Sequence, residues 1–290
     1  MPLEVIEGES EAAYHAKRGE YLTSSNIKDY MDCPAKFIDN LRFDNSRSSP
    51  AMDFGTAFHC RLLEGVEAFS ERYFTGGPVN PRTGAVYGSE TKAYAEWVEA
   101  NSQGGKRPIS PNDFSLIGRM VESVYANADA KRLLDACVKR EVTIRGEYFG
   151  LNLQARLDAC VWDGIAVVTD IKTCDSLNGF ERDIATRGYF IQLGLYGMLL
   201  GCIANMEAGA PAKQFIIAVE KSAPNRCAVW SMHADGVDNA ILDAIHGIIE
   251  SRKTGNYPHK YTGMRTFELK PWMSAQWGIG KREETDEWVG

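Results

Sequence analysis

The sequence predicts an α/β fold in which helices pack on a mixed central β-sheet. Short runs rich in β-branched and apolar residues begin near residue 141 and recur up to residue 232. Helical patterns precede, interrupt and follow these runs, and this order builds a sheet covered by helices. We therefore expect a single domain over residues 1–290, with the core sheet and its helices at 137–260 and a mainly helical elaboration at 23–136.

Several helices are predicted before the first of these strands. Residues 1–22 are expected to form a loosely ordered arm. Ser24 or Ser25 can cap the helix that follows, because a serine side chain accepts hydrogen bonds from free backbone N–H groups, and Pro34 is expected to end or restart it. Further helices are predicted at residues 52–64, 90–101 and 111–136, with loops at 46–50 and 75–90.

The strands form two groups. The first group, at 141–150, 151–162 and 165–173, is expected to pair as a meander, because Gly150 and Asp163-Gly164 supply turns. The remaining elements are an apolar helix at 178–205, strands at 213–220 and 226–232, an amphipathic helix at 235–253, and a tail at 261–290 without a clear period.

The composition is that of a globular protein. Of the 290 residues, 44% are hydrophobic and 24% are charged, which is enough apolar material for a large core. The formal net charge of -7 argues against a protein that coats nucleic acid non-specifically. It leaves room for a nucleic-acid enzyme that has acidic metal ligands and a basic channel.

We expect a cytoplasmic protein that is encoded by a bacterium or by a phage. The seven cysteines are scattered and include no CxxC pair, which indicates reduced thiols and argues against a zinc site. Residues 1–15 are acidic and lack the apolar core of a signal peptide. The most apolar stretch, 189–206, is too polar to span a membrane, so we expect no membrane contact.

The strongest chemical signal is Asp158 on one predicted strand, with Asp170 and Lys172 on the next. Residues two apart on a strand share a face, so Asp170 and Lys172 project together. Their neighbours are apolar, and a charged side chain among apolar ones is costly unless it is paired or binds a cation. Carboxylate oxygens are the ligands that Mg²⁺ prefers, so this pattern favours a metal site.

The hairpin register decides whether the two aspartates meet. A two-residue turn at Asp163-Gly164 would pair Asp158 with Thr169 and place the aspartates on opposite faces. A three-residue loop or a bulge would place them opposite each other, and we predict this irregularity because bulges are common beside functional sites. In the alternative interpretation, Asp170 and Lys172 form a simple ion pair on the strand face and Asp158 lies on the surface.

These residues belong to a wider set of motifs. Asp158 with Asp170-Ile171-Lys172 resembles the D…(D/E)xK signature of restriction-endonuclease-like (PD-(D/E)xK) nucleases. Three further segments resemble motifs of the branch that contains RecB-type nuclease domains and RecE-type (exonuclease VIII-like) recombination exonucleases. They are the Ser-x-Leu…Cys/Thr-Pro helix at 24–34, Gly-x-x-x-His at 55–59 and Gln-x-x-x-Tyr at 192–196. The runs DFGTAFHCRLLE and FSERY, and YHA at 14–16, are especially similar to RecE-type enzymes.

The resemblance extends over roughly residues 14–260 and implies a metal centre. It implies that Asp158 and Asp170 hold two Mg²⁺ ions, for which Mn²⁺ is expected to substitute, and that the Ile171 carbonyl is a further ligand. It implies that Lys172 positions the attacking water and stabilises charge on the phosphate. Part of the branch carries an iron–sulfur cluster that needs three late cysteines, and no cysteine follows Cys227, so no cluster is expected here.

Other site residues are expected on weaker grounds. His59 matches the metal-side histidine of the family, although a lone helix histidine is more often hydrogen-bonded in the core. Glu141 is a possible further metal ligand, or a solvated residue at a strand start. Gln192 and Tyr196 are four apart and share a helix face, which in the family leans over the site, whereas Tyr196 alone would fit plain packing. Candidate phosphate contacts are Arg156, Thr173, Arg182, Arg187 and Tyr189.

The resemblance implies a 5′→3′ exonuclease that degrades linear double-stranded DNA from its ends and leaves 3′ single-stranded tails. It also implies a ring-like homo-oligomer, expected to be a tetramer, and a single-strand annealing partner of the RecT or Redβ kind. Two alternatives stay open: a Cas4-like or single-strand-directed nuclease with the same site, and a catalytically idle DNA-binding module of the same fold. The sequence contains no P-loop, so no ATPase motor is expected.

Overall fold

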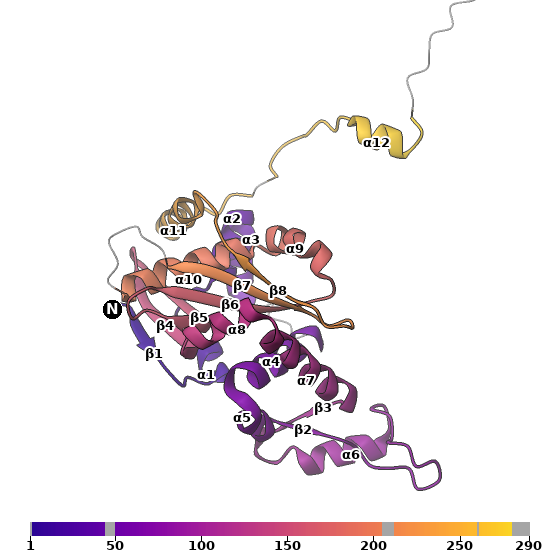
Figure 1. Ribbon diagram of the computed structural model, residues 1–290. Coiled ribbons are helices and arrows are strands. Elements are labelled where there is room, and N and C mark those ends of the chain that lie inside the picture. Colours follow the sequence, from indigo (N-terminus) through magenta and orange to yellow (C-terminus); the bar gives the residue numbers. More distant parts are fainter. Residues whose placement is uncertain (1, 44–49, 205–211, 260, 280–290) are drawn as a thin grey trace, which may run out of the picture.

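A six-stranded sheet lies between two layers of helices in the computed structural model, which describes residues 2–43, 50–204, 212–259 and 261–279 (Figure 1). The strand order is β1 (Glu4–Ile6), β4 (Lys139–Tyr148), β5 (Leu151–Val161), β6 (Val167–Cys174), β7 (Lys213–Glu220) and β8 (Cys227–Ser231). Strands β6 and β7 are parallel, and the other neighbouring strands are antiparallel. The predicted α/β fold with a mixed sheet is confirmed.

Each face of the sheet has its own hydrophobic core. One face is covered by α2 (Ser24–Asp32), α3 (Pro34–Phe43), α10 (Tyr189–Ile203) and α11 (Val237–Thr254). The other is covered by α4 (Pro50–His59), the π-helical turn η1 (Cys60–Glu64), α7 (Pro111–Ala126) and α8 (Ala128–Ala136). Alternation along β7 supplies both cores, since Ile216 packs in the first and Ile217 in the second.

A small lobe extends from the second layer, away from the sheet (Figure 1). It consists of α5 (Gly65–Arg72), β2 (Tyr73–Thr75), α6 (Lys92–Asn101), the 3-10 turn η2 (Gln103–Gly105) and β3 (Arg107–Ile109). Strands β2 and β3 form a parallel pair, and Phe74 packs against Trp97 with ring centroids 5.2 Å apart. The sequence did not indicate these strands, because three residues are too few to show a period.

The predicted helices and strands are largely present, with shifted ends. The helix cap predicted at Ser24 or Ser25 is wrong by one or two residues: Thr23 is the cap, and its N–H donates to Asn26 Oδ1 at 2.8 Å. As predicted, Pro34 separates two helices, because proline is tolerated at the first helical position. The predicted loop at 46–50 lies mostly outside the described residues.

Two predicted long helices are each broken. The apolar helix at 178–205 is in fact a 3-10 turn η3 (Leu177–Gly179), α9 (Phe180–Arg187) and α10, separated by Gly188 in the left-handed conformation at φ 61°. The helix at 111–136 breaks at Asn127, whose side chain accepts hydrogen bonds from the first N–H groups of α8. Apolar periodicity continues through both breaks, which is why the pattern alone did not reveal them.

The expectation of a loosely ordered arm at residues 1–22 is also wrong. Strand β1 pairs with β4, and α1 (Glu11–Ala16) buries Tyr14 against the body. Edge strands leave unpaired backbone groups, so a short added strand gains hydrogen bonds at the edge of β4. The segment is therefore part of the fold from its first described residues.

At the other end of the described chain, residues 261–279 extend away from the body and contain α12 (Pro271–Gln276) (Figure 1). No helix in the described parts of the chain is long and apolar enough to cross a membrane. Helix α10 approaches the sheet closely at Gly197, where a Cβ atom would lie 2.5 Å from the side-chain amide nitrogen of Gln214 on β7. A larger residue at this position would displace the end of the Gln214 side chain.

The end of β7 is fixed by Glu220, whose side chain is buried. Its carboxylate accepts from the Leu177 N–H at 2.7 Å and from the Arg226 guanidinium at 2.6 and 2.7 Å. The hydrogen bonds from Arg226 and Leu177 lower the pKa of Glu220 to about 2. This carboxylate ties the end of the sheet to the connection that leads into α9 and α10.

We expect Glu220→Gln to lower the free energy of unfolding by roughly 1–3 kcal/mol at pH 7, because buried hydrogen bonds to a charged group are lost. The pKa of the folded state lies below that of an unfolded glutamate. The stabilisation is therefore fully present above the unfolded pKa and is lost as the pH falls towards about 2. Urea unfolding at pH 7 and pH 3 should show a difference from wild type that shrinks at pH 3. Glu181→Gln, on the exposed side of α9, serves as the control.

Candidate metal centre

Strands β5 and β6 pair only briefly and then diverge. Three pairs join them, ending at Ala159 and Thr169. Continued by one step, this register would place Asp158 opposite Asp170. It is the register that a three-residue loop gives, so the predicted irregularity is present. The site lies in the fork where the two strands separate.

Asp158 replaces the backbone partner that β6 loses in this fork. Its Oδ2 accepts a hydrogen bond from the Ile171 N–H at 2.7 Å, and its Oδ1 lies 3.6 Å from His59 Nδ1. The Asp158 side chain is 13% exposed. Burial and the nearby Asp170 carboxylate raise its pKa to about 7. Negative charge is therefore crowded at this point of the sheet.

Glu141 lies beside Asp158 on the neighbouring strand. The pairs Arg140–Ala159 and Val142–Leu157 flank it, so Glu141 is in line with Asp158 across the sheet. Its backbone adopts φ 49°, a left-handed conformation that costs a non-glycine residue about 1–2 kcal/mol. Burial, and next the Asp158 charge, raise the pKa of Glu141. A strained acidic residue in this position indicates a functional constraint.

His59 reaches the fork from the end of α4, where the helix changes to the π-helical turn η1. Such turns are frequent at functional sites. His59 Nε2 lies 3.0 Å from the Ile171 carbonyl oxygen, which can only accept, so Nε2 carries the proton. Burial lowers the pKa of His59, which favours the neutral ring. The lone pair of Nδ1 then faces Asp158.

A cation fits this arrangement. One ligand atom each from His59, Glu141 and Asp158 lies within 4.8 Å of the others. The Nδ1 lone pair and two carboxylates are all acceptors, and acceptors that face one another in a half-buried site are stabilised by a proton or a cation between them. The carboxylate oxygens suit Mg²⁺ or Mn²⁺, and the imidazole nitrogen suits a transition metal such as Mn²⁺ better than it suits Mg²⁺.

Asp170 forms a second group, on the side of the fork covered by α10. Its Oδ2 lies 2.5 Å from Lys172 Nζ, and its Oδ1 accepts from Gln192 Nε2 at 3.2 Å. The Gln192 amide also donates to the Tyr196 hydroxyl at 3.1 Å, so these two residues share the face predicted for them. Asp170 Oδ2 is buried and meets the Lys172 ammonium, without a hydrogen bond from another described residue.

The comparisons with known proteins bear on the family and the fold. A family model described as a PDDEXK-like domain of unknown function (DUF3799) matches residues 23–259. The chain belongs to this family. The crystal structure of a protein from Eubacterium rectale described as a "Putative exonuclease" has a TM-score of 0.56 and 14% identity, over 93% of this chain and 98% of the other. At that identity the likeness shows the fold alone, and the search of curated proteins found no match.

PDDEXK nucleases generally use divalent metals, and the acidic residues of this PDDEXK-like domain are grouped differently from the grouping that the sequence predicted. Asp158 was expected beside Asp170 as a metal ligand, yet the compact group joins Asp158 to His59 and Glu141. The Ile171 carbonyl, expected as a ligand, faces His59 Nε2. Sequence spacing gave the register but not the direction of each carboxylate.

One basic residue of the site was missed. Lys28, on α2, donates to the Arg187 carbonyl at 3.2 Å. Burial, and next the positive charge of Lys172, lower the pKa of Lys28, and Asp170 opposes this shift. Two lysines therefore lie near Asp170, where an anionic substrate could bind. Lys28 falls within the motif at 24–34, but the sequence does not show which face of that helix meets the site.

Some of the residues predicted to contact phosphate lie at the fork, and others do not. Tyr189 lies against the Lys172 ammonium, which is 5.0 Å from the ring centroid, and Thr173 is half-buried on β6. Arg182 and Arg187 are exposed on α9, and Arg187 lies 3.9 Å from Asp183. Arg156 instead donates to Glu141 Oε2 at 2.6 Å, so its guanidinium is used within the protein.

We expect the protein to bind Mn²⁺ in solution and Asp158→Asn to weaken that binding by about tenfold or more, because even outer partners of metal ligands contribute that much. Isothermal titration calorimetry measures the dissociation constant directly. Asp163→Asn, on the exposed tip of the same hairpin, is the matched control and should bind as wild type does. Equal affinities for the two variants would remove Asp158 from the site.

Proposed function

We propose that this PDDEXK-like protein is a Mg²⁺-dependent DNA nuclease of the RecE type, which degrades linear duplex DNA 5′→3′ and leaves 3′ single-stranded tails. The observation that carries the proposal is the fork: Asp170 and Lys172 project from one side of β6 while Asp158 approaches from β5. Acidic ligands beside a lysine are what hydrolysis of a phosphodiester requires. The membership in the PDDEXK-like family supports the same reaction class.

Each residue has a role in this proposal. His59, Glu141, Asp158 and Asp170 would hold Mg²⁺, which supplies an activated water and offsets charge on the phosphate when bound. Lys172 holds Asp170 in place and presents a positive charge towards the phosphate. Lys28 adds a second positive charge near Asp170. Gln192 fixes the orientation of the Asp170 carboxylate through its amide.

The choice of an exonuclease with this polarity rests on resemblance. The YHA motif at 14–16 and the run at 53–64 are similar to RecE-type enzymes. The E. rectale protein with a similar fold carries the description "Putative exonuclease". A Cas4-like enzyme that acts on single strands, or an idle binding module, would share the fold but give different products in the assay below.

The decisive assay uses linear duplex labelled at either the 5′ or the 3′ end, with Mg²⁺ or with EDTA. We expect early release of the 5′ label, no digestion of closed circles and none in EDTA. Asp170→Asn should lower the rate by about 100-fold or more, since charge stabilisation in the transition state is lost. Asp175→Asn, 92% exposed just beyond the same strand, should cleave normally. Preference for single strands would favour the Cas4-like alternative, and absence of Mg²⁺-dependent cleavage the idle module.

We also propose a ring-like homo-oligomer, expected to be a tetramer, that works with an annealing protein of the RecT or Redβ kind. A ring would keep duplex within a channel and make digestion processive. Light scattering at micromolar concentration should give a mass of about four chains, and a larger complex when such an annealing protein is added. A monomer under both conditions would contradict the proposal.

A further inference from the structure

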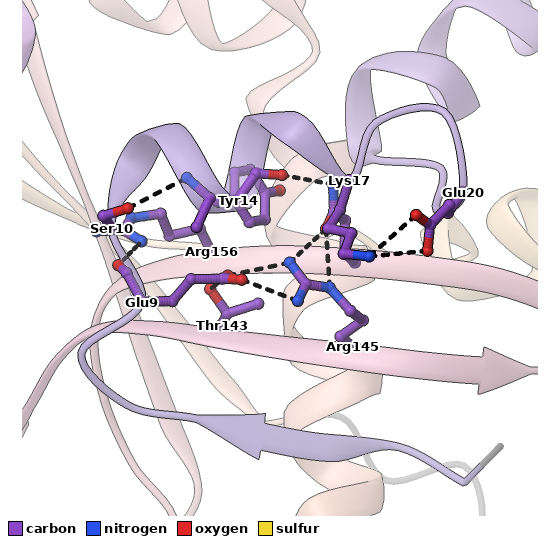
Figure 2. Close-up of polar contacts among 10 residues, drawn as sticks. Glu9, Ser10, Tyr14, Lys17, Glu20, Thr143, Arg145 and Arg156 are labelled. Atoms are coloured by element: carbon purple, nitrogen blue, oxygen red, sulfur yellow. Dashed lines mark hydrogen bonds and ion pairs between the residues drawn. The ribbon is translucent and has the colours of Figure 1, made fainter.

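The N-terminal segment, from β1 to the end of α1, lies along β4 and β5 (Figure 2). Strand β1 pairs with β4, with Val5 opposite Ile144. The chain then turns at Glu9 and Ser10 into α1, which packs above the two strands. The segment therefore brings the main chain of Glu9 next to side chains that project from β4 and β5.

The Glu9 carboxylate is anchored in this position by charged hydrogen bonds. It accepts from Arg145 at 2.9 and 3.0 Å and from Thr143 Oγ1 at 2.8 Å (Figure 2). Its side chain is 10% exposed and that of Arg145 is 7% exposed. Burial pushes the pKa of Glu9 up, but the hydrogen bonds from Arg145 and Thr143 outweigh it and hold the pKa below its usual value.

Arg145 is itself held from the other side, so the anchor is rigid. Its guanidinium donates to Gln154 Oε1 at 2.9 and 3.1 Å, and the Gln154 amide donates to the Tyr14 carbonyl at 3.3 Å. The network therefore closes on α1, which belongs to the same segment as Glu9. A fully bonded buried network of this kind specifies one arrangement of its members.

Arg156 joins this anchor to the metal centre. Its Nη1 donates to the Glu9 carbonyl oxygen at 2.6 Å, and its Nε donates to Glu141 Oε2 at 2.6 Å. The side chains of Arg156 and Glu141 are 15% and 17% exposed, so both charges depend on these contacts more than on water. One oxygen of the Glu141 carboxylate is thereby fixed, and Oε1 accepts no hydrogen bond from the residues that the structure describes.

The backbone of Glu141 makes this support necessary. Its φ of 49° is unfavourable, and it lies where the regular pairing of β4 with β5 is interrupted. The Glu141 backbone is strained and lacks a regular strand partner, so the direction of its carboxylate depends on a side-chain contact. Arg156 provides this contact, because its rigid, planar guanidinium donates to Glu141 and to the Glu9 carbonyl at the same time.

We propose that Arg156 and Glu9 are positioning residues of the metal centre: the N-terminal segment holds Arg156, and Arg156 holds Glu141 in the direction that a divalent cation needs. The inference rests on the proposed function, since it assigns the role of a metal ligand to Glu141. It gives residues 4–16 a part in metal binding as well as in covering the edge of the sheet.

The test is Mn²⁺ binding by calorimetry, together with the Mg²⁺ concentration that gives half-maximal cleavage. Arg156→Gln should raise the dissociation constant for Mn²⁺ and the half-maximal Mg²⁺ concentration by about tenfold each, because losing an outer partner of a metal ligand has an effect of that size. Cleavage at saturating Mg²⁺ should largely recover. Glu9→Gln should act in the same direction and more weakly, because the amide keeps the shape but loses the charge. Arg156→Lys should also weaken binding, since the compact ammonium lacks the planar array of N–H groups with which Arg156 reaches both Glu141 and the Glu9 carbonyl.

The matched control is Glu7→Ala. Glu7 belongs to the same segment and forms an ion pair with Lys139 at 2.6 Å, with side chains that are 54% and 39% exposed. Among the described residues, the hydrogen bonds of Arg156 go to Glu141 and Glu9 instead. Thermal unfolding of each variant shows which variants remain folded. If Arg156→Gln is unfolded, Mn²⁺ binding by Glu9→Gln tests the proposal in its place.

Two outcomes would overturn the inference in different ways. If folded Arg156→Gln and Glu9→Gln bind Mn²⁺ as wild type does, the segment is only a structural cover and the nuclease proposal stands. If the wild-type protein itself binds no Mn²⁺, both the proposed metal centre and the proposed role of its positioning residues are wrong. A tenfold loss in Arg156→Gln with normal binding in Glu7→Ala supports the proposal.

Discussion

The separation of β5 from β6 is the constraint on which the rest of the site depends. Beyond Ala159 and Thr169 the strands no longer pair, so the N–H and C=O of Ile171 would be left without partners in a buried place. An unsatisfied buried polar group costs roughly 1–3 kcal/mol, so such a fork cannot stay open without replacements. Asp158 accepts from the Ile171 N–H, and His59 binds the Ile171 carbonyl. The side chains that would hold a metal thus also hold the fork open.

The fork also explains why both helical layers contribute to one centre. In a continuous sheet, side chains on opposite faces are separated by the backbone. Where the strands part, His59 enters from α4 on one side, and Gln192 reaches Asp170 from α10 on the other. The change from α- to π-helix directly after His59 occurs at the point where α4 meets the fork. A site assembled in this way needs both cores to be packed before its ligands can meet.

The sequence predicts the framework of this site better than its details. Alternation along the strands and the spacing of the turn gave the fold class, the meander and the register that brings Asp158 near Asp170. These features depend on local periodicity, which a single sequence carries. The sequence could not show that Asp158 turns towards His59 and Glu141, or that Arg156 is taken up by Glu141, because these contacts join residues far apart in the chain. The sequence also did not show that the N-terminal segment is folded, because the contacts that fold it are with β4 and β5, far away in the chain.

The charges of the centre are arranged in two unequal halves. Asp170 is matched directly by Lys172, with Lys28 nearby, so its negative charge is largely offset within the protein. Glu141 is paired with Arg156, whose guanidinium is also bound to a main-chain carbonyl. Asp158 feels the charges of Lys172 and Arg156 without an ion pair to either among the described residues. Taking two carboxylates out of water costs several kcal/mol for each ion, and these contacts offset that cost only in part. The raised pKa values of Asp158 and Glu141 express this imbalance. A divalent cation beside His59 would remove it, and this half of the fork is therefore where the physical case for a metal is strongest.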